Sequence, residues 1–380
     1  MTYDYTIVGL GAAGAQLALA MSKDPYFNDK HILIIEKEES ITNDKRWSFW
    51  QKGKGDFDIL VKQSWNQGSF IGPSGKQQEL NLSPYSYKSI HSKDFFQYAR
   101  EQLRKHPSFT LLTDNIEQIN NEDNIYKIKG IENKYSSRVC FDSRVDDSFS
   151  TDLKKSILLW QHFKGWHIKC KTDVFNTDRF IMMDFSYRHN DTSFIYVLPY
   201  SKNEALIECT AFTSAIYTDD QQYESLIKKY ISNLGISDYE VLEIEKGKIP
   251  MSDYPFHQSS SGKLIKIGTA GSWVRPSTGY SFYYTSKYVS QTIEAIKTDS
   301  LPTLNLLSKK TRWLDSILLE VLYKENELGP KVFEDMYTKN SIQQIFAFLD
   351  GETSVAQDLN IIMSFEKLPF LKALIRYILR

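Results

Sequence analysis

TIVGLGAAGAQLALAMSK, residues 6–23, is an apolar run that meets three glycines and then continues with helical periodicity. The beginning of this run predicts a short buried strand over residues 3–8, followed by a tight turn and a helix. Gly9, Gly11 and Gly14 stand in the spacing G-x-G-x-x-G. In that spacing the first glycine permits the turn, the second lets the backbone approach a pyrophosphate, and the third lets the helix pack closely on the strand.

A second buried strand is predicted at residues 31–36, HILIIE, which ends in an acid. Glu36 follows Gly14 by 22 residues, where a carboxylate can accept hydrogen bonds from an adenosine ribose. This order of elements favours a dinucleotide site, and the alternative is a glycine-rich turn without a ligand. The unit begins at residue 3, which favours FAD over NAD by analogy with FAD enzymes. The predicted cofactor contacts here are Gly9, Gly11, Ala12, Ala13, Gly14, Glu36 and Lys37.

A second glycine cluster follows an apolar strand predicted at residues 264–267. Gly268 and Gly271 lie in a run of small residues that leads through PSTGYS, at 276–281, into a predicted helix. Small residues would let the backbone approach a flavin. FAD-dependent hydroxylases and halogenases usually have Asp where this chain has Thr269. We expect a flavin-facing loop, with a tight packing loop as the alternative; the expected contacts are Gly268, Gly271, Thr278, Gly279 and Tyr280.

The composition of the 380 residues narrows the class of protein. Lys and Arg number 46 against 47 Asp and Glu, so no excess charge points to nucleic acid. The 41% of hydrophobic residues exclude a disordered chain, and three Cys exclude a disulfide scaffold and fit a reducing compartment. Aromatic residues make up 14%, which indicates either a thick core or a site for a large apolar ligand. Seven scattered His predict no metal site.

Seven short segments occur in an order that is more specific than any one of them. They are RWSFW at 46–50, FDSR at 141–144, QHFKGW at 161–166, MMDF at 182–185, YVLP at 196–199 with LIECT at 206–210, GKIP at 247–250, and PSTGYS at 276–281. Together they resemble the flavin-dependent lycopene cyclase family of bacteria and plants, over most of the chain.

The resemblance implies a mixed α/β (α+β) fold with three parts. A Rossmann-like FAD-binding domain of the hydroxylase or glutathione-reductase type is interleaved with a substrate domain built on an antiparallel sheet, and a helical region follows. The expected boundaries are residues 1–64, 91–158 and 247–300 for the FAD-binding domain, 65–90 and 159–246 for the substrate domain, and 301–380 for the helical region.

The resemblance also implies an isomerase reaction without net electron transfer. A terminal double bond of lycopene is protonated, the tertiary cation closes a six-membered ring, and a proton is lost. The ψ-ends of lycopene would become β-ionone rings, giving β-carotene by way of γ-carotene. Reduced FAD would be the active cofactor, with NAD(P)H only as its external reductant. The sequence leaves open whether the ring is of the β, ε or γ type and whether one end or both react.

Glu208 is the predicted proton donor. It lies in ALIECT at 205–210, the second strand of a predicted hairpin whose first strand covers residues 193–198. Alternation places Leu206 and Glu208 on one face and Cys209 on the other. A carboxyl group among apolar neighbours keeps its proton more easily, as an acid requires. The alternative is a glutamate on an exposed face, or one paired with an arginine.

Aromatic rings and one arginine complete the predicted site. Ring faces can stabilise a carbocation, although core packing is an equally good explanation for each ring. Arg46 is assigned to the cofactor. The aromatic candidates for substrate or cation contact are Trp47, Phe49, Trp50, Tyr196 and Tyr280.

Two positions depart from the family pattern. The family often has an acid after its central glutamate; this chain has Cys209, so a carboxylate that could raise the pKa of Glu208 is missing. The family often has His before PSTGYS, and this chain has Arg275, which could alter flavin or substrate contacts. Neither change removes Glu208, so activity is expected while the identity of the product is left open.

The last part of the chain predicts helices separated by Gly, Pro and capping residues. The final helix carries Lys372, Arg376 and Arg380 on one face and a wide apolar face opposite. This pattern suits a membrane surface and suits equally a terminal helix packed on the core. We expect a cytoplasmic protein with peripheral membrane contact and no transmembrane span, because its apolar runs are too short. The predicted helices cover residues 311–325, 331–338, 341–350, 353–363 and 367–380.

Two other classes of function stay open at this point. A redox flavoenzyme of the same fold, such as a prenyl or carotenoid reductase, a hydroxylase or a halogenase, would consume NAD(P)H or oxygen. A flavin- or lipid-binding homologue without catalytic activity would keep the glycines but carry out no turnover. The oligomeric state is not predicted.

Overall fold

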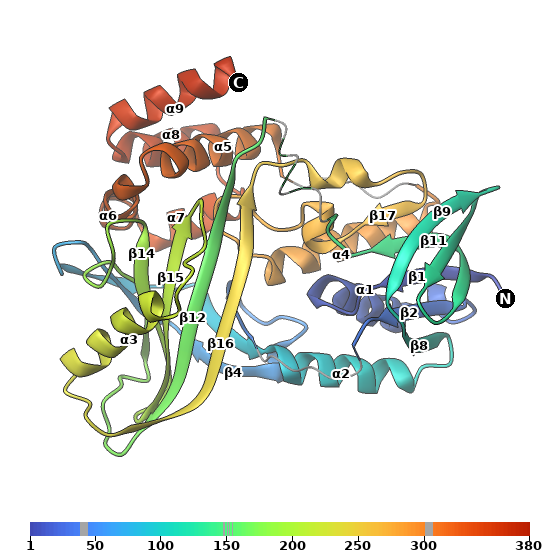
Figure 1. Ribbon diagram of the computed structural model, residues 1–380, viewed down its shortest axis with the longest axis horizontal. Helices are drawn as coiled ribbons and strands as arrows, with labels where there is room; N and C mark the ends of the chain where they lie inside the picture. Colours follow the sequence, from blue (N-terminus) through green and yellow to red (C-terminus); the bar gives the residue numbers. More distant parts are fainter. Residues whose placement is uncertain (39–44, 147–148, 150, 152, 154, 301–306) are drawn as a thin grey trace.

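The computed structural model describes the whole chain except residues 39–44, 147, 148, 150, 152, 154 and 301–306. The first residues of the predicted helical region, 301–306, therefore lie outside the described part. Two large sheets stand at opposite ends of an elongated molecule, and helices pack on both (Figure 1). The N-terminus lies at the end of the first sheet, and the C-terminus lies beside the helices of the second (Figure 1).

The first sheet grows from the predicted strand–helix–strand unit. β1 pairs in parallel with β2 on one side and with β11 on the other, and β17 runs parallel to the end of β11. The strands predicted at residues 3–8 and 31–36 are confirmed. In sheet order the strands are β8 (Phe109–Thr113), β2 (Ile32–Glu36), β1 (Tyr3–Val8), β11 (Lys134–Asp142), β10 (Ile125–Gly130) and β9 (Ile116–Glu122), with β17 (Leu264–Lys266) beside β11.

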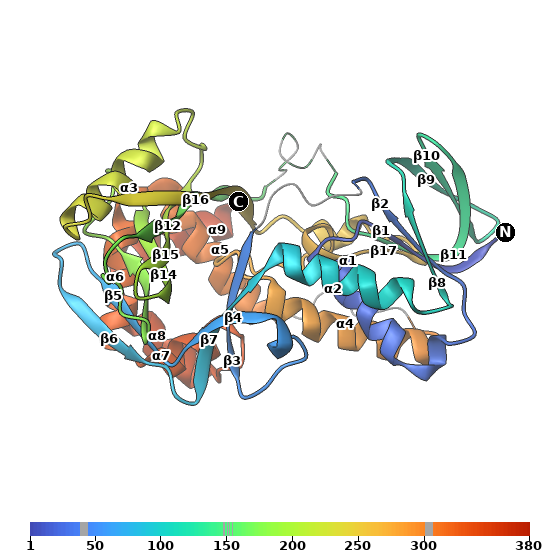
Figure 2. The ribbon, with the colours of Figure 1, turned by 90° about the horizontal axis from the view of Figure 1, so that it is seen from below.

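Helices cover one face of this sheet, as Figures 1 and 2 show. Helix α1 (Ala12–Lys23) packs against α2 (Ser92–Arg104) and α4 (Phe282–Lys297), and all three share one apolar core with the sheet. On the opposite face, a smaller cluster with Leu33 and Cys140 packs against β9 and β10. Helix α4, which comes late in the chain, thus completes the apolar core that begins with β1 and α1.

The second sheet contains the predicted hairpin, which is confirmed as β14 paired with β15. Leu206 packs into an aromatic core on one face, whereas Ile207 and Cys209 face α3 (Gln221–Asn233) on the other. Long strands β12 and β16 run side by side (Figure 1). The sheet order is β16 (Tyr239–Ser252), β12 (Leu158–Cys170), β15 (Glu204–Thr213), β14 (Ser193–Ser201), β13 (Arg179–Asp184), β5 (Gln67–Ile71) and β6 (Gln77–Asn81).

A three-stranded antiparallel sheet links the two larger ones. It consists of β3 (Arg46–Lys52), β7 (Tyr85–His91) and β4 (Val61–Trp65), with β7 in the middle. Strand β3 belongs to the predicted FAD-binding segment and β7 mostly to the predicted substrate segment, so this sheet crosses the expected boundary. The exact domain limits stay a prediction.

After residue 307, the described part of the chain forms five helices, and each overlaps a predicted helix. Ser341 and Ser354 begin two of them with reciprocal capping boxes to Gln344 and Gln357. In the part of the chain that the structure describes, no helix is both long and apolar enough to span a membrane. The five are α5 (Lys309–Lys324), α6 (Gly329–Lys339), α7 (Ile342–Leu349), α8 (Val355–Ser364) and α9 (Lys367–Leu379).

Aromatic rings fill the space between the second sheet and these helices. Trp50 stacks on Phe346 with ring centroids 4.5 Å apart, and Phe70 stacks on Tyr337 at 4.7 Å. Such stacks add to the stabilisation from burial alone. Part of the aromatic content therefore forms a thick core, and some of these rings also line the pocket described next.

Candidate active site

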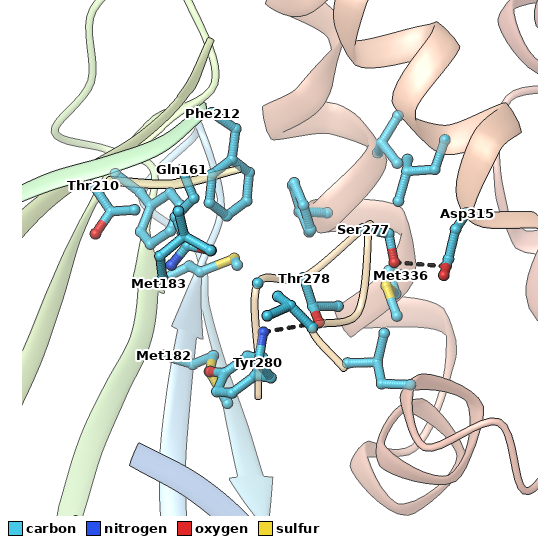
Figure 3. A pocket seen from close by; sticks show the side chains of 18 of the residues that line it. Gln161, Met182, Met183, Thr210, Phe212, Ser277, Thr278, Tyr280, Asp315 and Met336 are labelled. Atoms are coloured by element: carbon cyan, nitrogen blue, oxygen red, sulfur yellow. Dashed lines mark hydrogen bonds between the residues drawn. The ribbon is translucent and has the colours of Figure 1, made fainter. Parts of the chain in front are cut away.

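A cavity of about 530 Å³ lies where the second sheet, the C-terminal helices and the 267–281 loop, which connects β17 to α4, meet (Figure 3). Thr210 and Phe212 line it from β15, Tyr280 from the loop and Met336 from α6 (Figure 3). Most of its lining side chains are aromatic or aliphatic, and a few are charged. This lining suits a large apolar ligand that is handled by few polar groups.

The carboxyl ends of parallel strands form a second part of the site. β1, β2, β11 and β17 end side by side, at Val8, Glu36, Asp142 and Lys266. In open α/β sheets, ligands bind outside this edge. Both predicted glycine clusters follow directly, after β1 and after β17, so the fold brings the beginning and the late part of the chain to one place.

The first glycine cluster has the backbone geometry that its spacing predicts. Gly9 has φ +93°, and a Cβ at Gly14 would lie 2.0 Å from the carbonyl oxygen of Gly9. A Cβ at Gly11 would meet nothing within 4 Å, so the space beside it is open. Ala12 and Ala13 begin helix α1, whose N-terminal N–H groups can bind an anion.

The second cluster touches the first. Gly268 has φ +62°, and a Cβ there would lie 3.0 Å from the Cβ of Ala13. Glu36 folds over the same turn: its Oε2 accepts a hydrogen bond from the N–H of Leu10 at 2.6 Å, and its Oε1 accepts one from the N–H of Lys37 at 2.9 Å. The Lys37 side chain is exposed. The structure thus places the predicted cofactor residues of both clusters together.

The rest of the 267–281 loop packs tightly on neighbouring strands. A Cβ at Gly271 would lie 2.3 Å from the carbonyl oxygen of Lys266, and one at Gly279 would lie 2.3 Å from Gln161 Oε1. Thr278 Oγ1 accepts a hydrogen bond from the N–H of Tyr280 at 3.3 Å (Figure 3). These contacts fit both alternatives, the tight packing loop and the flavin-facing loop, because a loop that packs closely on strands can also face a flavin.

Three tyrosines, one buried and two partly buried, join this loop to the pocket wall. Tyr87 Oη lies 2.8 Å from Tyr196 Oη and 3.0 Å from Tyr280 Oη. Burial raises the pKa of all three phenols well above its ordinary value, so they stay neutral. Tyr196 and Tyr280 are predicted site residues that the fold brings together. Tyr87 was missed, because β7 carries none of the quoted motifs.

Glu208 stands in the pocket wall on β15, with only 7% of its surface exposed. Thr210 Oγ1 donates a hydrogen bond to Glu208 Oε1 at 2.6 Å. Burial, followed by the neighbouring carboxylate of Glu245, raises the pKa of Glu208 well above its ordinary value, although Thr210 and Arg46 oppose the rise. The predicted proton donor therefore favours its protonated form.

Glu245, on β16, is the acid that the sequence analysis missed. Arg46 Nη1 donates to Glu245 Oε2 at 3.1 Å, and Arg46 Nη2 donates to Glu243 Oε2 at 2.5 Å and contacts His167 Nδ1 at 3.0 Å. The structure thus places the guanidinium of Arg46, expected at the cofactor, on these glutamates. The only sequence signal for Glu245 was its position two residues before the motif at Gly247.

The expected consequence of Cys209 needs correction. Its side chain lies in the core under α3, together with Ile207 and Tyr223, on the face opposite Glu208. An acid at this position would therefore not face Glu208. A carboxylate that raises the pKa of Glu208 is nevertheless present, because Glu245 supplies it from another strand.

The predicted aromatic residues divide between pocket and core. Trp47 and Trp50 line the pocket, as predicted. Phe49 does not: it is 6% exposed and stacks on Phe282, with ring centroids 5.2 Å apart, in the core of the first sheet. Its assignment to substrate contact is wrong, because β3 directs this ring into that core.

Arg275, the second departure from the family pattern, has a structural explanation. It is 1% exposed, and its Nη2 donates to Asp315 of α5 at 3.0 Å. It also donates to the carbonyl oxygens of Phe348 and Leu349 in α7. Ser277 Oγ donates to the same Asp315 at 2.7 Å (Figure 3). Arg275 therefore ties the 267–281 loop to the C-terminal helices.

The pocket extends to α8 and α9, where Met363, Phe370, Leu371 and Leu374 line it. Around this end, many large apolar side chains are exposed to solvent. We call this set the apolar ridge; its members are Val355, Leu359, Met363, Leu368, Leu371, Ile375, Ile378 and Leu379.

Two of the three basic residues predicted on one face of the final helix pair with carboxylates of the protein. Arg376 pairs with Glu325 at 3.4 Å, and Arg380 pairs with Asp253. Helix α9 packs on α5, with Ala373 fully buried between them. Both arginines therefore contact carboxylates of the protein itself, and membrane contact stays a prediction.

Several solved structures that share this fold are described as flavin-dependent proteins or hold FAD. The chain is similar to a geranylgeranyl bacteriochlorophyll reductase-like protein from Thermoplasma acidophilum, with 16% identity, a TM-score of 0.58 and 98% of each chain covered. It is also similar to the flavin-dependent brominase Bmp2, with 14% identity, a TM-score of 0.56 and 99% of each chain covered. A variant of halogenase PltM in complex with FAD has 10% identity and a TM-score of 0.56, over 92% of this chain and 79% of that chain. The predicted fold class is therefore confirmed.

Within that class, the sequence identifies the family. Residues 4–375 match the family described as lycopene cyclase protein, so the chain belongs to it. The resemblance that rests on seven short segments is thereby confirmed. No curated protein matches the sequence significantly.

We predict that Arg275→Met destabilises the protein by about 3–5 kcal/mol, because it leaves Asp315 buried and unpaired. Urea unfolding followed by circular dichroism would measure the loss. Lys129→Met, which breaks an exposed pair with Glu117, is the control and should change stability by less than about 1 kcal/mol. Equal effects of the two substitutions would contradict the role given to the buried pair.

Proposed function

We propose that this chain is a lycopene β-cyclase, which converts the ψ-ends of lycopene to β-ionone rings without net electron transfer. The observation that carries the proposal is Glu208, a carboxyl group buried in an aromatic pocket whose pKa is raised by burial and by Glu245. Membership of the lycopene cyclase family supports the substrate class. The product would be β-carotene, formed by way of γ-carotene.

The residues of the pocket would perform the steps of an acid-initiated ring closure. The O–H bond of Glu208 breaks, a C–H bond forms at a terminal double bond, and a tertiary cation remains. The neighbouring double bond supplies the electron pair that closes the ring, and loss of a ring proton leaves substrate and product with equal mass. Rings such as Trp50 and Tyr280 can stabilise the cation, and apolar walls exclude the water that would trap it.

We further propose FAD as the cofactor. The open space beside Gly11 and the N-terminal N–H groups of α1 fit a pyrophosphate, and Glu36 lies on the ribose side of the same edge. The 267–281 loop leads from that edge to the pocket. Bound in its reduced form, a flavin would supply an electron-rich ring beside the cation, with NAD(P)H as the external reductant.

Contact with a membrane surface is the third part of the proposal, since lycopene does not dissolve in water. Two members of the apolar ridge, Met363 on α8 and Leu371 on α9, also line the pocket, so a carotenoid could pass from lipid along them into the cavity. Because Arg376 and Arg380 are paired within the protein, apolar burial rather than basic charge would supply most of the binding.

The first prediction concerns the reaction itself. Anaerobic incubation with lycopene, FAD and a reductant should give a cyclic product of unchanged mass, as measured by chromatography and mass spectrometry. A lighter or heavier product would point to a redox flavoenzyme, and unaltered lycopene to a homologue without catalytic activity.

Glu208→Gln should bind FAD normally but lower the rate by about 10²-fold or more, since the general acid is lost. Glu204→Gln, on the same strand but outside the pocket, should keep the wild-type rate.

The cofactor site can be tested with two glycines that differ in what surrounds them. Gly11→Ala places its methyl group in open space, so the free protein should unfold as the wild type does. The same methyl group should lower the affinity for FAD about tenfold, roughly 1.4 kcal/mol, if a pyrophosphate lies there. Gly14→Ala, which clashes with Gly9, should instead reduce stability. Flavin fluorescence titration gives the affinity, and an unchanged value for Gly11→Ala would argue against this site.

Membrane contact can be tested by flotation with vesicles of neutral and anionic phospholipid. Replacement of Leu371, Ile375 and Ile378 by Ser removes exposed apolar side chains and should reduce the floated fraction severalfold. Leu242→Ser with Ile244→Ser, at an exposed apolar site on β16, is the matched control. If neither variant changes flotation, α9 serves only to pack on α5.

A further inference from the structure

A single row of residues in the second sheet brings two acids together. Gly165 on β12 pairs with Glu208 on β15 at one side and with Glu245 on β16 at the other. Directly opposed residues of antiparallel strands project to the same face. Both carboxyl groups accordingly belong to the pocket wall.

Gly165 is what lets the two side chains meet. A Cβ at this position would lie 3.2 Å from Glu245 Cγ, 3.3 Å from Glu208 Cβ and 2.9 Å from a methyl group of Leu206. Any other residue would therefore stand between the two acids. With glycine there, the two carboxyl groups come within hydrogen-bonding reach, and this contact raises the pKa of Glu208 beyond the effect of burial.

The surroundings decide which acid carries the proton. Two carboxylates this close do not both ionise readily, so the pair holds one proton. Burial raises the pKa of Glu245 too, but Arg46 and the hydrogen bond from Glu208 oppose that rise. Because Arg46 donates a hydrogen bond to Glu245, the negative charge is favoured on Glu245 and the proton on Glu208.

The charged and titratable groups that face this pair come from four other places. Arg46 from β3 is the cation, and its 3.1 Å bond to Glu245 offsets one negative charge. Burial and Arg46 lower the pKa of His167 on β12, which favours its neutral form. Tyr196 from β14 and Tyr280 from the 267–281 loop are neutral.

We propose that Glu245 is a positioning residue, which keeps the proton on Glu208 between turnovers, and that Gly165 sets the distance between them. This inference rests on the function proposed above. When Glu208 gives its proton to the substrate, the O–H bond breaks and a C–H bond forms, so two adjacent carboxylates then face the new cation. Before the transfer, the negative charge of Glu245 would therefore keep the proton on Glu208. During the transfer, the same negative charge would stabilise the positive charge that develops on the substrate.

An infrared titration tests this arrangement in the intact protein without lycopene. The C=O stretching band that the wild type shows and Glu208→Gln lacks belongs to protonated Glu208. In Glu245→Gln this band should disappear at a pH lower by about one unit or more, because the neighbouring negative charge is gone. The alkaline limb of the cyclisation rate should move in the same direction.

Glu243→Gln is the matched control, since Glu243 binds the same Arg46 from the same strand but does not hydrogen-bond to Glu208. Its band should titrate as in the wild type. A shift as large as that of Glu245→Gln would overturn the specific role of Glu245, and so would an unshifted band in Glu245→Gln.

Gly165→Ala provides a second variant that keeps both acids and only separates them. Its band should also titrate at lower pH, and an unshifted band would overturn the role of Gly165 even if Glu245→Gln failed to fold. Because the band is measured without substrate, a wild type that shows these shifts but does not cyclise lycopene would refute the proposed function and leave the paired acids in place.

Discussion

Two buried acids that cannot both be charged constrain the whole pocket. Glu208 and Glu245 have lost most of their contact with water, so a second negative charge beside the first would be costly without a cation. Arg46 provides that cation from β3, so the three-stranded sheet has to reach the second sheet. The three-stranded sheet that links the two large sheets therefore has an electrostatic role, the delivery of Arg46 to the two acids, in addition to its packing contacts.

The 267–281 loop places a cofactor edge and an acid within one site. Its first glycine touches helix α1 through Ala13, and its last glycine lies against Gln161 in the second sheet. Between them, Arg275 anchors the loop to α5 and α7. A family position that usually holds His is thus used here for attachment.

Much of this arrangement could be predicted, because its signals are local. The glycine spacing, the hairpin around Glu208 and the five C-terminal helices each follow from neighbouring residues and are confirmed. Glu245 could not be predicted, because it reaches Glu208 only across a third strand whose register no local pattern reveals. The failure at Phe49 arises because alternation shows that two faces of a strand differ but not which core each face meets. The expectation about Cys209 failed for another reason, since alternation already placed Cys209 on the face opposite Glu208.

The buried pair between Arg275 and Asp315 has a consequence for how the molecule responds to its ligands. Since it joins the 267–281 loop to helices near the end of the chain, whatever orders the loop also stabilises those helices, and the coupling acts equally in the opposite direction. If FAD binds as proposed, its uptake would therefore also stabilise the helices at the far wall of the pocket. A freshly made chain that has not yet taken up its cofactor would have a looser C-terminal third, which quality-control proteases could distinguish from the loaded protein.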